Sequence, residues 1–247
     1  MIELHPLINF GKFPIFSIMV AIGFISSVAL YIYNSKKIND ERHKKEDLII
    51  LLGISFLIGL ATSNIGNWFI YPKYQTFTLI EKIKSSGYTF YFGLIGFLVS
   101  IFILLKLFKY RYSEYLNEIV PSITLFHAIG RTGCLLGGCC YGKIWDITVF
   151  SLAIERFPVR EIEILILISL TILFQIKIKK RRIYFYLTVY PITRFFIEYM
   201  RGDDRGYLFI KFLSPSQIIS LIIISIILSV LFFEKIKTNC IPPNNPS

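Results

Sequence analysis

Charge is scarce in this sequence. Of its 247 residues, 17% are Asp, Glu, Lys or Arg, whereas 54% are hydrophobic and the mean hydropathy is +0.61. A soluble domain usually carries about 25% charged residues, and the apolar residues stand in long blocks that a core of this size cannot bury. The composition therefore excludes a water-soluble globule and intrinsic disorder, and it predicts an integral membrane protein.

Cysteine is also rare, and its placement is local. Three of the four cysteines, Cys134, Cys139 and Cys140, fall within seven residues, which excludes a disulfide framework of the secreted kind. The net charge of +11 does not indicate nucleic-acid binding, because the basic residues separate apolar blocks instead of lining one face. We expect them to mark topology and contact with anionic lipid.

Apolar runs and their breaks predict an all-α membrane protein with about seven crossings. The predicted spans are 13–34, 47–71, 89–109, 115–140, 160–177, 183–200 and 214–233. Basic residues gather in alternate loops, so the positive-inside rule places the N-terminus outside and the C-terminus in the cytoplasm. We expect one domain over 1–239, a flexible C-terminal tail over 240–247, and a small or absent extracytoplasmic head.

Polar residues inside the predicted spans are the candidates for function, because charge at mid-bilayer is costly. On a helix, His127, Arg131 and Cys134 share one face. The pair Gly137-Gly138 disfavours further helix, which predicts backbone N–H groups free to bind an anion near the cysteines. The alternative for His127 is a structural hydrogen bond to a neighbouring helix.

A second polar stretch runs from Tyr190 to Arg205. Arg194 and Glu198 are four residues apart, and Arg201 continues their helical face. Arg194 is partly neutralised by Glu198 and still able to direct donors at a phosphate. Alternatively, the pair is purely structural.

The cysteine cluster has competing interpretations. Its spacing is not the C-x-x-C pattern typical of zinc, and a vicinal Cys139-Cys140 pair fits poorly in an ordinary disulfide. Free cysteines packed as small apolar residues are the commonest arrangement inside a membrane. From the sequence we therefore predict no metal site and no cofactor.

These residues carry a resemblance to a known family. The stretch 130–142 resembles the G-R-x-G-N-F-x-N-G-E-x-x-G signature of bacterial prolipoprotein diacylglyceryl transferases, matched at Gly130, Arg131, Gly133, Gly138 and Gly142. Tyr91-Phe-Gly-Leu-Ile-Gly96 is similar to the family's H-G-G-L-I-G, Pro158 with Glu163 to P-S-Q-L-Y-E, and the segment from Tyr190 to Y-x-x-x-R-x-x-x-E-x-x-R-x-x-D. The resemblance covers nearly the whole chain.

The resemblance implies a transfer at the outer leaflet of the bacterial plasma membrane. The diacylglyceryl group of phosphatidylglycerol, or of another anionic glycerophospholipid, would move to the lipobox thiol of a membrane-inserted preprolipoprotein signal peptide or to another thiol acceptor. Arg131 and Arg194 match the family's two essential arginines, which implies that they bind the phosphate. The further substrate-binding positions it implies are Asn64, Gly133, Cys134, Gly138, Cys139, Gly142, Tyr190, Glu198 and Arg201.

Several positions depart from the family pattern. Tyr91 replaces the histidine often assigned as base, so the candidate catalytic residues are Arg131, Arg194, His127 and Tyr91. Asn64 replaces an arginine, Cys134 an asparagine and Cys139 a glutamate. We hypothesise that His127 serves as general base, because an ordinary pKa near 6.5 suits proton abstraction at neutral pH. Two alternatives stay open: a paralogue with a different acceptor whose cysteines act as carrier or redox pair, and a non-catalytic protein that binds or moves lipid.

Overall fold

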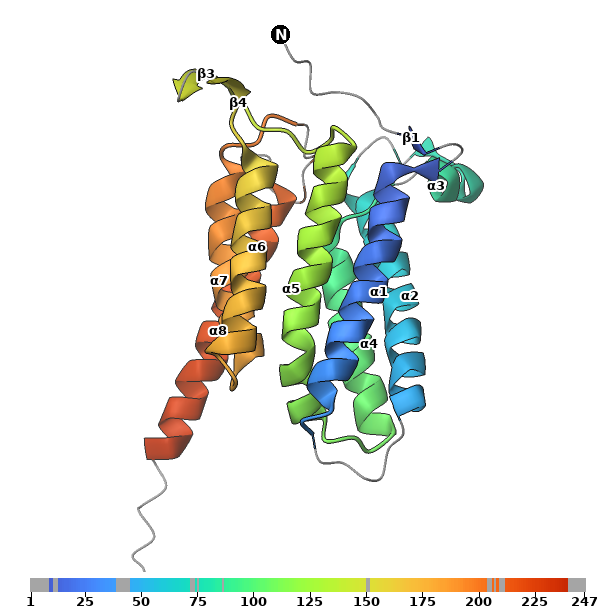
Figure 1. The fold of residues 1–247 in the computed structure, drawn as a ribbon, viewed down its shortest axis with the longest axis vertical. Helices are drawn as coiled ribbons and strands as arrows, with labels where there is room; N and C mark the ends of the chain where they lie inside the picture. The colour runs from blue at the N-terminus through green and yellow to red at the C-terminus, as the bar shows by residue number, and fades with distance from the viewer. Residues whose placement is uncertain are drawn as a thin grey trace, which may run out of the picture.

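The computed structural model describes residues 9–10, 13–38, 45–71, 74, 76–85, 87–149, 152–203, 206, 208 and 212–239. Its helices are α1 (Ile15–Ser35), α2 (Lys45–Ile70), α3 (Leu79–Ser85), α4 (Phe90–Leu107), α5 (Tyr112–Leu136), α6 (Val159–Ile176), α7 (Arg182–Glu198) and α8 (Pro215–Asn239). The long helices run alternately up and down through the molecule (Figure 1). A helix therefore forms at each of the seven predicted spans, whereas the predicted tail, 240–247, lies outside the described residues.

Helix α5 is the centre of the packing. It contacts α1 on one side and α6 and α7 on the other, so it joins the group α1, α2 and α4 to the group α6, α7 and α8 (Figure 1). Of the helices apolar enough to cross a membrane, α5 has the largest buried share. A Cβ on Gly133 would lie 3.0 Å from the Cβ of Met19, so this glycine lets α1 approach α5 closely.

Small residues also bring α2 and α4 together. A Cβ on Gly66 would lie 2.2 Å from the Phe92 ring, and one on Gly96 would lie 2.0 Å from the Thr62 hydroxyl. The Thr62 hydroxyl also donates to the Phe92 carbonyl oxygen across the interface (3.1 Å). These contacts fix the position of α4, which carries Tyr91.

Five helices of the described chain are long and apolar enough to cross a membrane: α1, α2, α4, α5 and α8. This confirms the prediction of a helical integral membrane protein. Helix α7 has only 17 residues, and α6 begins with Arg160, Glu161 and Glu163, so neither has a long window of low charge. The number of crossings and the orientation of the termini stay predictions.

Short elements at one end of the bundle were not predicted. They are α3, the hairpin of β1 (Asn9–Phe10) with β2 (Phe13–Pro14), and the hairpin of β3 (Ile144–Val149) with β4 (Leu152–Arg156) (Figure 1). The start of α3 did have a sequence signal, because Thr78 and Glu81 form a capping box: the backbone N–H of Thr78 donates to Glu81 (2.8 Å), and that of Glu81 donates to the Thr78 hydroxyl (3.4 Å).

Candidate active site

A cavity of about 470 Å³ lies among α1, α2, α4, α5, α7 and α8. Most of its lining is aliphatic or aromatic, which suits acyl chains more than a soluble ligand. The polar exceptions include all four residues predicted as catalytic, and two of the cysteines lie beside them. These lining residues are Tyr91, His127, Arg131, Cys134, Cys140 and Arg194.

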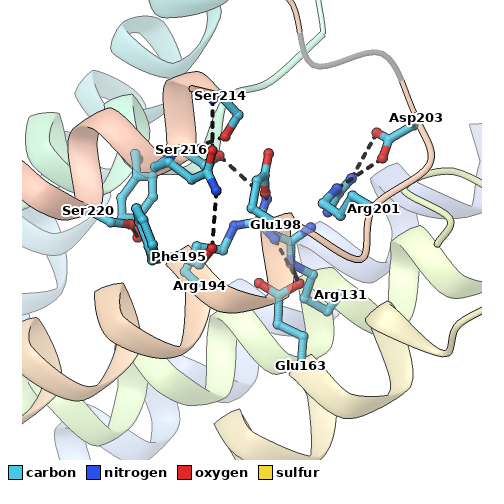
Figure 2. Close-up of polar contacts among 12 residues, drawn as sticks. Arg131, Glu163, Arg194, Phe195, Glu198, Arg201, Asp203, Ser214, Ser216 and Ser220 are labelled. Carbon is cyan, nitrogen blue, oxygen red and sulfur yellow. Dashed lines mark hydrogen bonds and ion pairs between the residues drawn. The ribbon is translucent and has the colours of Figure 1, made fainter. Parts of the chain in front are cut away.

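Glu163 of α6 joins the two predicted arginines. One carboxylate oxygen, Oε2, lies 3.0 Å from Arg131 Nε and 3.5 Å from Arg194 Nη1. Arg194 also pairs with Glu198, as predicted from the spacing, at 2.7 Å (Figure 2). All four side chains are buried, so two arginines and two carboxylates form a neutral network. The sequence offered Arg131 no acidic partner within a helical turn; its partner comes from another helix.

Both arginines keep a side toward the cavity. The closest contact of Arg131 with Glu163 is through Nε, so its terminal amino groups lie farther from that carboxylate. Arg194 reaches the Ser216 hydroxyl, at the start of α8, with Nη2 (3.5 Å). Because guanidinium groups present donors in a fixed plane, two of them bordering one cavity can bind an anionic group from two directions.

Tyr190 connects this network to His127. Its hydroxyl donates to Glu163 Oε1 (3.0 Å) and lies 3.3 Å from His127 Nε2, while the imidazole stacks on Phe90 with ring centroids 3.5 Å apart. Since the single hydroxyl proton is directed to the carboxylate, Nε2 must carry a proton and donate to Tyr190. The lone pair is then on Nδ1, which is buried and has no hydrogen-bond partner within the described residues.

Tyr91 is held by α8 and not by this network. Its hydroxyl lies 2.7 Å from that of Ser220, and either can donate. Both side chains are buried. Tyr91 thus lines the cavity, but no described contact links its hydroxyl to His127 or to the arginines.

The backbone N–H groups that follow α5 are used within its closing turn. The N–H groups of Gly137, Gly138 and Cys139 donate to the carbonyl oxygens of Gly133, Leu135 and Cys134. The predicted free N–H groups are therefore wrong for these three positions, because the turn uses them internally. Gly138 takes a positive φ of 67°, which favours glycine.

Gly142 has no space for a side chain. A Cβ there would lie 2.1 Å from the Phe157 carbonyl oxygen. Gly142 also forms an antiparallel bridge with Arg201, so this part of the signature holds the end of α5 to the end of α7. Its role in the structure is close packing.

Other predicted positions lie away from the cavity. Arg201 does not continue the Arg194 face, because α7 ends at Glu198; it binds Asp203 through two hydrogen bonds of 2.9 and 2.8 Å. Burial opposes its charge, but these bonds raise the pKa of Arg201 above its usual value. Asn64 is half-buried on α2 and is not a lining residue, whereas Asn67, one turn later, is.

The three clustered cysteines converge. Their sulfur atoms all lie within 4.8 Å of one another, and none is in a disulfide. Cys134 is buried and Cys139 is exposed. Tyr190, Cys134 and Cys139 were predicted site residues. Cys140, Glu163, Ser216 and Ser220 were not. The signal for Glu163 was available, because an acidic residue inside an apolar span requires a partner.

Comparison with known proteins identifies the family of this chain. The family model of prolipoprotein diacylglyceryl transferase matches residues 6–233. A phosphatidylglycerol–prolipoprotein diacylglyceryl transferase of Clostridium tetani is 28% identical over 89% of this chain and 92% of its own length. The protein of that name in Clostridioides difficile is 29% identical, over 91% and 92%, and the second such protein of Clostridium perfringens is 27% identical, over 85% and 86%. Because the family model matches nearly the full length of the sequence, this chain belongs to the prolipoprotein diacylglyceryl transferase family.

Proposed function

We propose that this protein transfers the diacylglyceryl group of phosphatidylglycerol to the thiol of a preprolipoprotein lipobox cysteine. The observation that carries the proposal is the position of Arg131 and Arg194, which come from two helices and border one apolar cavity. Such a cavity suits a molecule with an anionic head and long acyl chains. The family membership agrees with this substrate class.

We further propose seven crossings of the bacterial plasma membrane, with the N-terminus outside and the site toward the outer leaflet. Two observations support this topology. The long helices alternate in direction, and the C-terminal ends of α1, α4 and α6, each followed by basic residues in the sequence, lie at the end opposite the two hairpins (Figure 1). Arg131 lies near the end of α5 that leads into β3, which is the proposed outer end.

In the proposed reaction, the phosphate lies between the two guanidinium groups. The acceptor S–H gives its proton to Nδ1 of His127, and the sulfur attacks the glycerol carbon attached to the phosphate oxygen. The C–O bond breaks, its electron pair leaves with glycerol phosphate, and a thioether forms. Arg131 and Arg194 stabilise the charge that develops on the leaving group.

Glu163 and Tyr190 are positioning residues in this scheme. Glu163 orients both guanidinium groups before substrate binds, which reduces the cost of arranging them during reaction. Tyr190 fixes the His127 tautomer because its hydroxyl donates a hydrogen bond to Glu163 and can only accept one from His127. Tyr91 borders the reactants and is held by Ser220.

The test replaces each arginine by lysine, which retains the charge but loses the planar pair of donors. We expect R131K and R194K each to reduce transfer by roughly 10²-fold, the effect of losing one donor to a developing oxyanion. Purified protein is reconstituted with phosphatidylglycerol and a lipobox peptide, and the peptide mass is followed. Complementation of a strain depleted of its own diacylglyceryl transferase gives an independent measurement.

Arg182 provides the matched control. It is a buried arginine paired with Glu118 at the opposite end of the bundle, away from the cavity. R182K should therefore retain transfer per folded molecule. Transfer at the wild-type rate in R131K and R194K would refute the proposal, and headgroup-dependent binding by a wild-type protein without turnover would favour the non-catalytic alternative.

A further inference from the structure

The cysteine cluster lies at the edge of the cavity and has no part in the reaction described above. Cys134 is in the last turn of α5, and Cys139 and Cys140 follow the Gly137-Gly138 turn. A positive φ at Cys140, 61°, bends the chain there, a conformation that non-glycine residues adopt only when the surroundings impose it. The result is three sulfur atoms within 4.8 Å of one another.

These distances suit a cation. Zn–S bonds of about 2.3 Å in a tetrahedral site place the sulfur atoms about 3.8 Å apart. Closing the cluster around an ion therefore needs sulfur movements of about 1 Å, which small changes in side-chain torsion supply. Spacing along the chain gave no reason to expect such a site, because four residues separate Cys134 from Cys139; the turn brings the two side chains together.

Positively charged side chains lie near the cluster. Arg131 is close enough to act electrostatically on all three sulfur groups, and Arg201 on Cys140. Three thiolates around a divalent ion carry a net charge of −1, and the two guanidinium groups nearby are each paired with a carboxylate. A thiolate set selects soft or borderline ions such as Zn²⁺ over Mg²⁺ or Ca²⁺.

We propose that Cys134, Cys139 and Cys140 bind one Zn²⁺ ion whose fourth coordination position is open to the cavity and takes the acceptor sulfur. Cys134 and Cys140 line the cavity, so an ion held by the cluster borders the reactants. Three protein ligands with one open position are typical of catalytic zinc sites. The role of the fourth ligand rests on the proposed function, whereas the binding of the ion does not.

The bound ion adds one step to the proposed reaction, the binding of the acceptor sulfur to the ion. The acceptor thiol gives its proton to His127 Nδ1 and its sulfur binds the ion as a thiolate, which favours deprotonation at neutral pH. That sulfur then forms the bond to the glycerol carbon, while the C–O bond electrons leave with glycerol phosphate. The thioether product binds the ion weakly and departs, and no electron is gained or lost by the metal.

The first experiment measures metal binding without lipid substrate. Full-length protein is purified in detergent with a phosphine reductant, and its zinc content is determined by mass spectrometry of the metal. We expect about one Zn²⁺ per chain in the wild type and less than a tenth of that in the C134S/C139S/C140S variant. The fourth cysteine gives a matched control, so C240S should retain the ion.

Cobalt substitution then reports the ligands directly, because thiolate-to-Co²⁺ charge-transfer absorption appears only when sulfur is bound. The band should weaken in each single Cys→Ser variant and persist in C240S. Size-exclusion chromatography confirms that the variants fold. Equal zinc content in the wild type and the triple variant, or a reduced wild type without zinc, would overturn the site.

The second experiment addresses the fourth ligand. A lipobox peptide should shift the cobalt band, a Cys→Ala peptide should not, and removal of the ion should reduce transfer at least tenfold. Undiminished transfer by metal-free protein would overturn the role of the fourth ligand while the site itself stands. Zinc binding in a protein without any transferase activity would instead refute the proposed function alone.

Discussion

Glu163 is the carboxylate on which the two arginines depend, so Glu163→Gln is the most informative substitution in the fold. Glutamine preserves the shape of the side chain and an oxygen that accepts from Tyr190, but it removes the negative charge shared by Arg131 and Arg194. The variant leaves four buried side chains with a net charge of +1 where the wild type has zero. Loss of one member of a buried ion pair costs about 3 to 5 kcal/mol.

The same charge argument predicts a compensating effect of lipid. A bound phosphate supplies the negative charge that the substitution removes. Adding phosphatidylglycerol should therefore raise the free energy of unfolding of E163Q by more than it raises that of the wild type. Phosphatidylcholine, whose headgroup is neutral overall, should give a smaller recovery. Unfolding is measured by denaturant titration in micelles containing either lipid, and transfer activity is measured in parallel.

Glu118→Gln serves as the comparison. This carboxylate also neutralises a buried arginine, Arg182, but at the far end of the bundle. E118Q should be destabilised without any difference between the two lipids. If E163Q is as stable as the wild type, or if its stability is independent of headgroup charge, then the neutral network is not what holds the arginines and the reasoning fails.

Two further predictions concern the proposed base, His127, and the close packing of Gly142. His127→Ala should abolish transfer in reconstituted membranes, whereas Tyr91→Phe should leave part of it, because Nδ1 of His127 has no hydrogen-bond partner in the described chain and the Tyr91 hydroxyl is paired with Ser220. Full activity in H127A would exclude His127 as the base. Gly142→Ala should prevent folding or lower the unfolding midpoint sharply, because its Cβ would lie 2.1 Å from the Phe157 carbonyl oxygen, whereas Gly130→Ala should be tolerated, since nothing lies within 4 Å of a Cβ there. Equal thermal unfolding of these two glycine variants would contradict the packing argument.

Interactions within one helix were the part of the site that the sequence predicted well. The spacing of Arg194 and Glu198 predicted their pair, which is present at 2.7 Å. The Gly137-Gly138 pair predicted the end of α5, which stops at Leu136. Both follow from helical geometry and backbone preference, which are local properties of the chain.

Interactions between helices could not be predicted in the same way. Glu163 meets Arg131 because α6 packs against α5 in one register, and hydrophobic periodicity does not determine that register. The convergence of the cysteines depends on a turn with positive φ at Gly138 and Cys140. A sequence can indicate positive φ at a glycine, but it gives no such indication at a cysteine. The β3–β4 hairpin had no strong strand pattern and was expected only as a small head.

The neutral network affects how strongly the enzyme stabilises the charge on the leaving group relative to the charge on the substrate. Arg131 and Arg194 are balanced by Glu163 and Glu198, so net charge does not attract the lipid to this site. The phosphodiester of the substrate carries one negative charge, whereas the glycerol phosphate that leaves acquires a second as the C–O bond breaks. Guanidinium groups already held in place by carboxylates interact more strongly with the doubly charged leaving group than with the singly charged phosphodiester. This difference lowers the barrier to transfer. The carboxylates therefore contribute to the proposed catalysis by fixing the arginines before the charge develops.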